Sequence, residues 1–510
     1  MRLGELLALA DLRTELSHLP PPAADPWIQR IVTDSRRVEA GDLFVGLPGS
    51  QVDGGQFWAE ALAQGAVAAL VSQESIGAEG SLDARVITLP TSQIAVACAR
   101  LAAAFYGFPG HHLRLIGVTG TNGKTTTTHL IEHLLIAAGQ PTGLMGTLYS
   151  RWGNTLQVAD HTTPFALELQ ERLAAAQQAG CQQVVMEVSS HALAQQRVWG
   201  CTFAVAVWTN LTQDHLDFHA DMEDYWQAKA QLFSPTYRRG RAIINQDDAG
   251  GRRLLTQLRQ ADPSGLVWSY SGQPQTAGES ADIWPEWVEW GSQDLTARIH
   301  TPIGSVDLQA PLTGTFNLAN LLAAIGAVVE RGVDLPTIQA ALPHFVGVPG
   351  RMESVTLPGQ DVRVIVDYAH TPDGLENLLK ALRPLVKTRL ICVFGCGGDR
   401  DRRKRPLMGK IAATWADQVV ITSDNPRTED PQQILQDILA GLPDTSTPYS
   451  VELDRRTAIR QAIEQAQPHD MVVIAGKGHE DYQILGKTKI HFDDREEARL
   501  ALRQRLGEIP

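Results

Sequence analysis

Short apolar runs separated by glycine and proline characterise the first part of the chain. Apolar stretches at 43–45, 67–71 and 86–89 have the length of β-strands. An alanine-rich stretch at 91–106 has the length and composition of a helix. Residues 1–107 are therefore predicted to form a first domain of strands and helices.

From residue 113 the apolar pattern alternates between strand and helix. Strands are predicted at 113–118, 184–188 and 203–209, and helices from Lys124 and over 166–179. Such alternation is typical of a parallel sheet covered by helices. We expect a central α/β domain of this kind.

Residues 262–312 depart from this alternation. The segment contains Trp268, Trp284, Trp287 and Trp290. The pattern around Pro302 and Gly304 predicts a hairpin over 295–312. We interpret the segment as a strand-rich appendage whose tryptophans are packing residues. A helix predicted over 316–331 follows it.

After a linker at 343–350 the strand and helix alternation resumes. Strands are predicted at 362–366, 390–394, 418–422 and 471–475. Helical segments between them indicate an α/β domain of the doubly wound, Rossmann-like type. The sequence thus predicts three domains, 1–107, 108–343 and 344–510, as expected for 510 residues at about 150 residues per domain.

Composition narrows the functional classes. Hydrophobic residues make up 43% and charged residues 20%, as in packed soluble domains. A formal net charge of −13 argues against nucleic-acid binding. Five cysteines without CxxC spacing favour a reducing compartment. The apolar run at 321–329 is shorter than the roughly 20 residues that cross a bilayer, so a cytoplasmic protein without membrane contact is expected.

The strongest local signal is a glycine-rich loop at 117–126, between a predicted strand and a predicted helix. Its glycines allow backbone N–H groups to face phosphate oxygens, Lys124 supplies positive charge, and the Thr125 hydroxyl can hold Mg²⁺. Val118 stands where the ordinary Walker A motif has its first glycine. The alternative is a glycine-rich turn without a ligand.

The loop, read as Thr-Gly-Thr-Asn-Gly-Lys-Thr at 119–125, resembles that of the Mur ligase family. Further segments agree in the family's order: 186–193 (MEVSSHAL), 209–211 (TNL), 214–217 (DHLD), 314–320 (GTFNLAN), 350–353 (GRME) and 367–372 (DYAHTP). The resemblance covers nearly the whole chain. It implies a three-domain α/β fold with a central P-loop ATPase-like domain and a Rossmann-like C-terminal domain.

The resemblance implies ATP and Mg²⁺ as cofactors. The implied ATP-binding residues are Gly120, Thr121, Asn122, Gly123, Lys124, Thr125, Thr126, Asn317, Asn320, Arg351, Asp367 and His370. The implied catalytic residues are Lys124, Glu187, His215 and Lys229. The implied metal ligands are Thr125, Glu187, His215 and Lys229, the last as a carbamate. An acyl phosphate would then be the intermediate of amide formation.

Two stretches, 34–36 (DSR) with 41–44 (GDLF) and 424–427 (DNPR), resemble those of the family members that add meso-diaminopimelate to UDP-N-acetylmuramoyl-L-alanyl-D-glutamate. The implied contacts to the UDP-muramoyl peptide are Ser35, Gln51, Thr162, Thr163, Ser189, Gln195, Arg197 and Lys229. Those to diaminopimelate are Arg400, Asp424, Asn425, Pro426, Arg427, Gly476 and Glu480. Arg427 matters most, because a guanidinium suits the carboxylate that lysine lacks. A monomer is expected.

Each site residue also has an ordinary explanation. A glutamate at a strand end such as Glu187, or a helical lysine such as Lys229, is usually solvated. His215 alone indicates a turn or packing residue. Thr162 and Thr163 before Pro164 fit a helix cap, and Gly476 fits a tight turn.

Three rival functions share some of these features. A lysine-adding Mur ligase would use the same loop with a different acceptor. A folylpolyglutamate synthetase-like ligase explains the loop but not the 34–36 (DSR) or 424–427 (DNPR) segments. A P-loop switch or transport ATPase predicts a strand ending in Asp, where this chain has Glu187.

Overall fold

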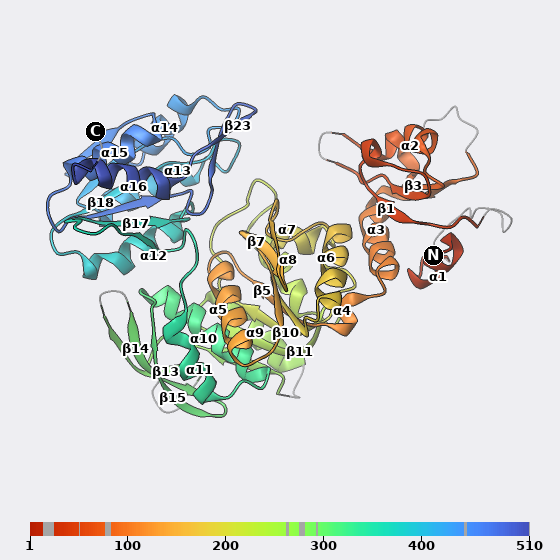
Figure 1. The fold of residues 1–510 in the computed structure, drawn as a ribbon, viewed down its shortest axis with the longest axis horizontal. Helices are drawn as coiled ribbons and strands as arrows, with labels where there is room; N and C mark the ends of the chain where they lie inside the picture. Colours follow the sequence, from red (N-terminus) through yellow and green to blue (C-terminus); the bar gives the residue numbers. More distant parts are fainter. Residues whose placement is uncertain are drawn as a thin grey trace. The chain divides into compact units, whose positions relative to one another are not determined.

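The computed structural model describes residues 1–13, 25–49, 52–76, 83–261, 265–274, 281–291, 294–442 and 446–508. The chain forms two compact units. The first contains 1–119, 139–207 and 228–242, and the second contains 120–138, 208–227 and 243–510. Figure 1 traces the elements of both units along the sequence.

The first unit opens with a parallel four-stranded sheet of order β1-β2-β3-β4. Its strands are β1 Arg30–Val32, β2 Asp42–Val45, β3 Ala68–Ser72 and β4 Val86–Leu89. Successive side chains of a strand face opposite sides, so Leu43 and Val45 pack with α1 (Leu3–Leu9) and α3 (Thr91–Phe105), and Phe44 packs with α2 (Trp58–Gln64). The three strands and the helix predicted in this region are confirmed.

An eight-stranded sheet has the order β12-β11-β10-β5-β9-β6-β7-β8, and most of its strands belong to the first unit. They are β5 Arg114–Thr119, β6 Thr142–Met145, β7 Tyr149–Trp152, β8 Thr155–Val158, β9 Gln183–Glu187, β10 Phe203–Trp208, β11 Arg238–Asn245 and β12 Val267–Tyr270. β9 pairs in parallel with β5 and β6. The predicted parallel sheet is confirmed, with strand ends within about a residue of those expected.

The helices around this sheet follow the predicted alternation. They are α4 Pro109–His112, α5 Lys124–Ala137, α6 Ala166–Gln178, α7 Ser190–Ala194, α8 Met222–Ala230, α9 Ala249–Ala261, α10 Thr315–Glu330 and α11 Leu335–Ala341. α5 and α10 belong to the second unit and pack against each other there. This pairing brings the beginnings of both helices to one hollow.

A three-stranded antiparallel sheet confirms the strand-rich appendage. It comprises β13 Trp284–Trp290, β14 Leu295–Thr301 and β15 Gly304–Ala310. Trp268 and Trp284 are partly buried, but Trp287 and Trp290 are 39% and 42% exposed. The interpretation of all four tryptophans as packing residues is therefore wrong for these two, whose rings reach solvent.

The second unit ends in a six-stranded sheet of order β16-β17-β21-β18-β19-β20. The strands are β16 Glu353–Val355, β17 Arg363–Asp367, β18 Leu390–Phe394, β19 Gln418–Ile421, β20 Tyr449–Val451 and β21 Met471–Ala475. α12 (Pro372–Leu382), α13 (Lys404–Trp415) and α14 (Pro431–Leu439) cover one face, and α15 (Arg455–Gln465) and α16 (Asp494–Arg505) cover the other. The predicted doubly wound domain is confirmed.

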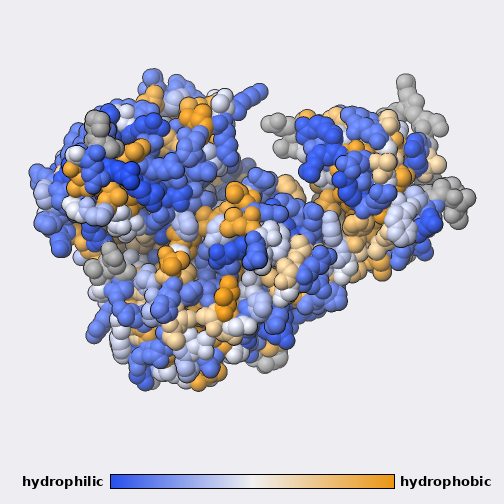
Figure 2. Space-filling view, in the orientation of Figure 1, coloured by the Kyte–Doolittle hydropathy of each residue, from blue (hydrophilic) through white to orange (hydrophobic). Residues whose placement is uncertain are grey.

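A hairpin of β22 (Tyr482–Leu485) and β23 (Thr488–His491) lies between β21 and α16 in the sequence. Short 3-10 helices complete the described chain: η2 Ser35–Arg37, η3 Gly54–Phe57, η4 Gln73–Ser75, η5 Gln231–Phe233, η6 Leu342–His344 and η7 Arg383–Leu385. Hydrophilic residues predominate on the face seen in Figure 2. No helix within the described ranges has both the length and the apolar character needed to cross a bilayer. All five cysteines are buried as free thiols.

Candidate functional site

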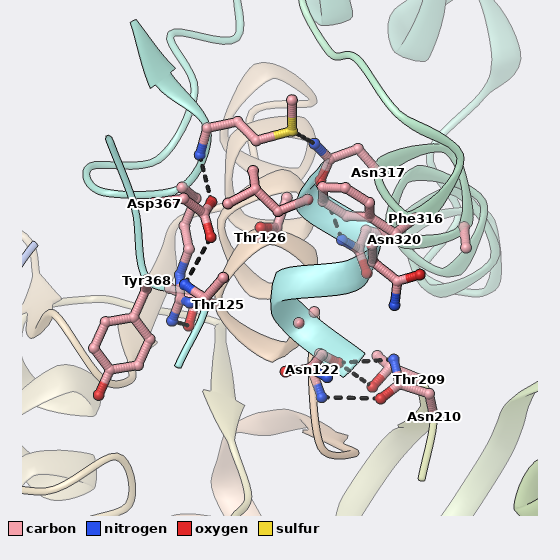
Figure 3. Close-up of a pocket in the computed structure, with 18 of the residues that line it drawn as sticks. Asn122, Thr125, Thr126, Thr209, Asn210, Phe316, Asn317, Asn320, Asp367 and Tyr368 are labelled. Atoms are coloured by element: carbon pink, nitrogen blue, oxygen red, sulfur yellow. Dashed lines mark hydrogen bonds between the residues drawn. The ribbon is translucent and has the colours of Figure 1, made fainter. Parts of the chain in front are cut away.

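A hollow in the second unit, with an empty volume of about 930 Å³, gathers segments far apart in the sequence (Figure 3). The glycine loop, the start of α10 and the segments around β17 line it. The lining includes Asn122, Gly123, Thr125, Thr126, Thr209, Asn210, Asn245, Tyr270, Phe316, Asn317, Asn320, Arg351, Met352, Asp367, Tyr368 and Asn377.

The glycine loop connects the end of β5 to the first residue of α5. Gly123 has φ +85°, and a Cβ there would collide with Asn320 Oδ1, so both the turn and the close approach of α10 require glycine. Lys124 Nζ donates hydrogen bonds of 2.8 Å to the carbonyl oxygens of Gly120 and Thr121. The loop therefore curls around an ammonium group at a helix N-terminus, which is an arrangement suited to phosphate.

The segment after β10 forms hydrogen bonds with the glycine loop. The Asn122 carbonyl accepts hydrogen bonds from Thr209 Oγ1 at 2.6 Å and Asn210 Nδ2 at 3.1 Å, and Asn122 N–H donates to Asn210 Oδ1 at 2.9 Å. Asn122 Nδ2 donates to Asp373 Oδ2 at 2.9 Å. These contacts fix the loop in the conformation drawn in Figure 3.

Arg351 forms a cationic wall of the hollow. Its Nη2 donates to Thr125 Oγ1 at 3.2 Å, and its guanidinium lies 4.4 Å from the centre of the Tyr368 ring. Asp367 accepts hydrogen bonds from the N–H groups of Met352 at 2.7 Å and Ala369 at 2.8 Å, while burial raises the pKa of its carboxyl. The hollow thus combines a cation that can bind phosphate with an aromatic wall.

The start of α10 contributes amides. Asn317 Nδ2 donates to the Thr313 carbonyl at 2.9 Å, and Asn320 Nδ2 donates to Asn317 Oδ1 at 3.3 Å. Phe316 adds an apolar surface beside them. Amide groups next to an aromatic ring are the groups that a nucleobase can hydrogen-bond and stack on.

The structure brings together most of the residues predicted to bind ATP. The hollow is lined by Asn122, Gly123, Thr125, Thr126, Asn317, Asn320, Arg351 and Asp367. The predicted residues Gly120, Thr121, Lys124 and His370 lie outside this lining. Four further lining residues, Phe316, Tyr368, Asn245 and Asn377, were not predicted from the sequence. Phe316 and Tyr368 lie inside the motifs at 314–320 and 367–372.

His370 and the Asp214–His215 pair are also in the second unit. Burial and the charge of Lys404 lower the pKa of His370 to about 4, so its ring is neutral at pH 7. Asp214 Oδ2 lies 3.3 Å from His215 Nε2. Burial alone would raise the pKa of Asp214, but His215, His370 and Lys404 lower it to about 2. His215 has φ +56°, an uncommon backbone conformation for histidine that places it in a tight turn.

Glu187 ends β9 in the first unit and is buried. Its carboxylate accepts hydrogen bonds from Thr147 N–H at 2.8 Å and Thr147 Oγ1 at 3.0 Å. Thr163 Oγ1 donates to the Glu187 carbonyl at 2.8 Å and accepts from Ser189 N–H at 3.0 Å. The helix-cap explanation of the threonines at 162 and 163 is therefore wrong, because α6 begins at Ala166 and has no side-chain cap.

Lys229 lies in α8 and is among the largest fully buried side chains of the protein. The expectation that a helical lysine is solvated is wrong here. Of the predicted metal ligands, Thr125 and His215 belong to the second unit, and Glu187 and Lys229 to the first. Within the described residues, no group of three or more His, Cys, Asp or Glu side chains is arranged to hold a metal.

A larger hollow in the first unit includes two residues predicted to contact the UDP-muramoyl peptide, Gln195 and Arg197. Arg197 donates to the Thr163 carbonyl at 3.0 Å, lies 4.0 Å from the centre of the Phe165 ring, and has its pKa lowered to about 10 by burial. Ser35 is buried at the start of η2. Gln51 lies outside the described residues.

The predicted diaminopimelate residues meet at the carboxyl edge of the C-terminal sheet. Lys477 Nζ, which is fully buried, donates to Asn425 Oδ1 at 3.2 Å and Glu480 Oε2 at 3.0 Å, and lies 3.7 Å from Asp424 Oδ1. Asn425 Nδ2 donates to Glu480 Oε2 at 2.8 Å. A Cβ on Gly476 would lie 2.7 Å from Asp424 Oδ2, so glycine allows this approach. Lys477 was not among the predicted site residues.

Arg427 follows Pro426 with φ +52°. Its N–H donates to the Ile484 carbonyl at 3.1 Å, and its Nη1 donates to the Gly398 carbonyl at 2.8 Å. The β22–β23 hairpin and the loop after β18 thus hold it in place. Arg400 is exposed nearby, with its Cγ 3.8 Å from the position of a Cβ on Gly397. Arg427 is not part of the lining of the nucleotide hollow.

The parallel sheets, the glycine loop and the cationic hollow define a P-loop nucleotide-binding α/β protein. Family profiles match three successive segments: the Mur ligase family catalytic domain at 28–106, the Mur ligase middle domain at 118–328, and the Mur ligase glutamate ligase domain at 350–478. The chain belongs to the Mur ligase family. As a member, it is an ATP-dependent amide ligase that forms ADP.

Named relatives match nearly the whole chain. The UDP-N-acetylmuramoyl-L-alanyl-D-glutamate--2,6-diaminopimelate ligase of Trichormus variabilis is 59% identical over 506 residues, 99% of each chain. That of Gloeobacter violaceus is 59% identical over 505 residues, again 99% of each. A solved structure of an enzyme with the same name is 36% identical, covers 94% of this chain and 95% of its own, and has a TM-score of 0.65. MurF from Acinetobacter baumannii, 22% identical over 94% of each chain with a TM-score of 0.61, shares the fold.

Proposed function

We propose that this ligase joins meso-diaminopimelate to the γ-carboxylate of the D-glutamyl residue in UDP-N-acetylmuramoyl-L-alanyl-D-glutamate, a step of peptidoglycan precursor synthesis. The full-length similarity to two ligases named for this substrate and amino acid carries the proposal. Arg427 agrees with it. Diaminopimelate has one carboxylate more than lysine, and a guanidinium binds a carboxylate through two parallel hydrogen bonds.

The reaction proceeds through an acyl phosphate. The glutamyl carboxylate attacks the γ-phosphorus of ATP and ADP leaves; the deprotonated diaminopimelate amine then attacks the acyl carbon, and inorganic phosphate leaves. The first step brings two anions together, so cations must stabilise the transferring group. Lys124 and Arg351 supply them. The carbonyl oxygens of Gly120 and Thr121 hold the Lys124 ammonium at the loop.

The residues that would hold Mg²⁺ are Thr125, Glu187, His215 and a carbamate on Lys229. Mg²⁺ usually takes few protein oxygens and completes its shell with phosphate oxygens and water. Glu187 suits this, because Thr147 already orients its carboxylate. When bound, the ion neutralises charge on the phosphates.

The burial of Lys229 supports its carbamylation. A neutral amine can add CO₂ and release a proton to become a carbamate. That change replaces a buried cation with an anion. The product can ligate Mg²⁺ through oxygen.

The remaining predicted contacts divide between the two other substrates. The UDP-muramoyl peptide is assigned to Ser35, Gln51, Thr162, Thr163, Ser189, Gln195, Arg197 and Lys229. Diaminopimelate is assigned to Arg400, Asp424, Asn425, Pro426, Arg427, Gly476 and Glu480. Arg427 and Arg400 face its carboxylates, and Asp424 and Glu480 face its ammonium groups. Three domains, 1–107, 108–343 and 344–510, each bring one substrate, and the protein acts as a cytoplasmic monomer.

A coupled assay of ADP release tests this function. The purified protein is supplied with ATP, Mg²⁺ and UDP-N-acetylmuramoyl-L-alanyl-D-glutamate, and then with meso-diaminopimelate or L-lysine. We expect ADP release to depend on diaminopimelate and the tripeptide product to appear by mass spectrometry. Release with lysine instead would indicate the lysine-adding alternative. Release only with a folate and glutamate would indicate a folylpolyglutamate synthetase-like ligase.

A further inference from the structure

Arg455, the first residue of α15, has a completely buried guanidinium group. Its Nε and Nη2 donate 2.7 Å hydrogen bonds to the two carboxylate oxygens of Asp494, the equally buried first residue of α16. α15 and α16 pack against each other on one face of the C-terminal sheet (Figure 1). The pair is therefore a bidentate ion pair sealed between the helices and the sheet.

The same guanidinium holds two backbone positions of the sheet. Nη1 donates to the Ser423 carbonyl at 3.2 Å and Nη2 donates to the Ala475 carbonyl at 3.0 Å. Ser423 immediately precedes Asp424, and Ala475 immediately precedes Gly476. The two segments assigned to the amino acid therefore begin at the two carbonyl groups that Arg455 binds.

These two segments do not pair directly with each other through their strands. β18 lies between β21 and β19 in the sheet, so Arg455 spans it and connects its two neighbours. Breaking such a buried pair leaves an uncompensated charge and is costly, which keeps the guanidinium in one orientation. A lysine carries all its N–H donors on one nitrogen atom. It therefore cannot reproduce the hydrogen bonds that the planar guanidinium makes to Asp494, Ser423 and Ala475.

Arg455 also acts through its charge. It lowers the pKa of Asp424, although Lys477 lowers it more and burial opposes both. Burial alone would lower the pKa of Arg455, but Asp494 raises it, and Asp424 and Glu480 raise it further. The buried cations Arg455 and Lys477 thereby keep a cluster of three carboxylates together, which leaves negative charge for the ammonium group of an incoming amino acid.

We propose that Arg455, oriented by Asp494, is a positioning residue for the amino-acid site: it sets the spacing between the Asp424–Arg427 and Gly476–Glu480 segments. The inference rests on the proposed function, which assigns diaminopimelate to these segments. It predicts that disturbing Arg455 changes recognition of the amino acid and leaves recognition of ATP and the muramoyl peptide intact.

The test compares Arg455→Lys with Arg389→Lys. Arg389 binds the buried Asp470 through Nε at 3.0 Å and Nη2 at 2.6 Å, but at the opposite end of the sheet, where β18 and β21 begin. We expect Arg455→Lys to raise the KM for diaminopimelate about ten-fold, with KM for ATP and muramoyl dipeptide within about two-fold of wild type. Arg389→Lys should lower thermal stability without changing any KM. An unchanged KM for diaminopimelate, or an equal rise in all three, overturns the proposal.

Asp494→Asn serves if Arg455→Lys does not fold. It keeps the guanidinium and one acceptor oxygen but loses the bidentate pair, so the KM for diaminopimelate should rise about three-fold, again selectively. A wild-type KM for diaminopimelate in this variant also overturns the proposal. The wild-type enzyme distinguishes failure of this proposal from failure of the proposed function. Wild type without diaminopimelate-dependent ADP release refutes the proposed function. Active wild type together with variants whose KM for diaminopimelate is unchanged refutes only the role of Arg455.

Discussion

Lys477 donates a 3.0 Å hydrogen bond to Glu480 Oε2 from a fully buried ammonium group. Glu480 is also largely buried, and burial raises the pKa of its carboxyl despite the opposing charge of Lys477. Its ionisation therefore falls as the pH drops through this raised pKa. The carboxylate that we assign to the substrate ammonium titrates closer to neutrality than an ordinary glutamate.

We accordingly expect the KM for diaminopimelate to rise as the pH is lowered from 8 to 5. Glu480→Gln should raise this KM at pH 8 about ten-fold, because a neutral amide replaces the charged partner, and should flatten the acidic limb. Steady-state kinetics at saturating ATP measure both. Glu496→Gln, which alters an exposed glutamate paired with His491, is the control and should keep the wild-type profile. A Glu480→Gln profile with the same acidic limb would contradict the assignment.

Arg427 is expected to govern the choice of amino acid. Arg427→Ala removes the guanidinium held at the Gly398 carbonyl, so the ratio of kcat/KM for diaminopimelate to that for lysine should fall about 10- to 100-fold. Arg427→Lys should recover little of it, since an ammonium group cannot bind a carboxylate in bidentate fashion. Arg403→Lys, at an exposed arginine paired with Asp401, should leave the ratio unchanged. An unchanged ratio in Arg427→Ala would show that selectivity lies elsewhere.

Lys124→Ala should lower kcat about 10²- to 10³-fold, because the transferring phosphoryl group loses a positioned cation. ADP release at saturating substrates measures the effect. Lys380→Ala is the matched control: Lys380 pairs with Glu376 on the surface of α12 at 2.7 Å and should retain full activity. Turnover close to wild type in Lys124→Ala would remove the loop from the mechanism.

The parts of this site that could be predicted from the sequence are those written in contiguous residues. The loop ending at Lys124 and Thr125 combines its glycines, its cation and its hydroxyl within one short motif. By contrast, Tyr368 lines the hollow beside the guanidinium of Arg351, which comes from a different segment of the chain. Arg455 gives no local signal at all, since an arginine at the start of a helix is usually solvated, and its burial arises only when α15 and α16 pack together.

The same limit explains the wrong predictions. Thr163 precedes a proline and a helix, which fits a cap, but its hydroxyl instead binds the backbone of Glu187, at the end of β9, and of Ser189. Trp287 is an aromatic residue of a type that usually packs in a core, yet its side chain is exposed, and the local sequence does not indicate this. Local pattern fixes the elements well, whereas partners across the fold depend on tertiary packing.

Lys229 gives a prediction that can be tested first without a substitution. If its amine carries a carbamate, activity should fall in buffers depleted of CO₂ and return when bicarbonate is added, because the carbamate exchanges with dissolved CO₂. Lys229→Arg keeps a cation but cannot be carbamylated, and should be inactive with or without bicarbonate. Native mass spectrometry that finds only unmodified lysine in fully active enzyme would contradict the carbamate.

His370 and His479 should make the C-terminal domain sensitive to mild acid. Burial lowers the pKa of His370 to about 4 and that of His479 to about 3, below the value of about 6.5 in the unfolded chain. Below pH 6.5 the unfolded chain binds protons that the buried rings do not bind. The free energy of unfolding therefore falls by about 1.4 kcal/mol per pH unit for each ring as the pH drops toward the lowered pKa. Carboxylates with lowered pKa act only below about pH 4. Urea unfolding followed by circular dichroism at pH 7.5 and pH 5 should therefore show His370→Asn losing about 2 kcal/mol less than wild type. His491→Gln is the control: its ring is exposed, Glu496 raises its pKa, and the substitution should not reduce the acid sensitivity. Equal losses of unfolding free energy in wild type and His370→Asn would show that the buried ring does not cause the acid sensitivity.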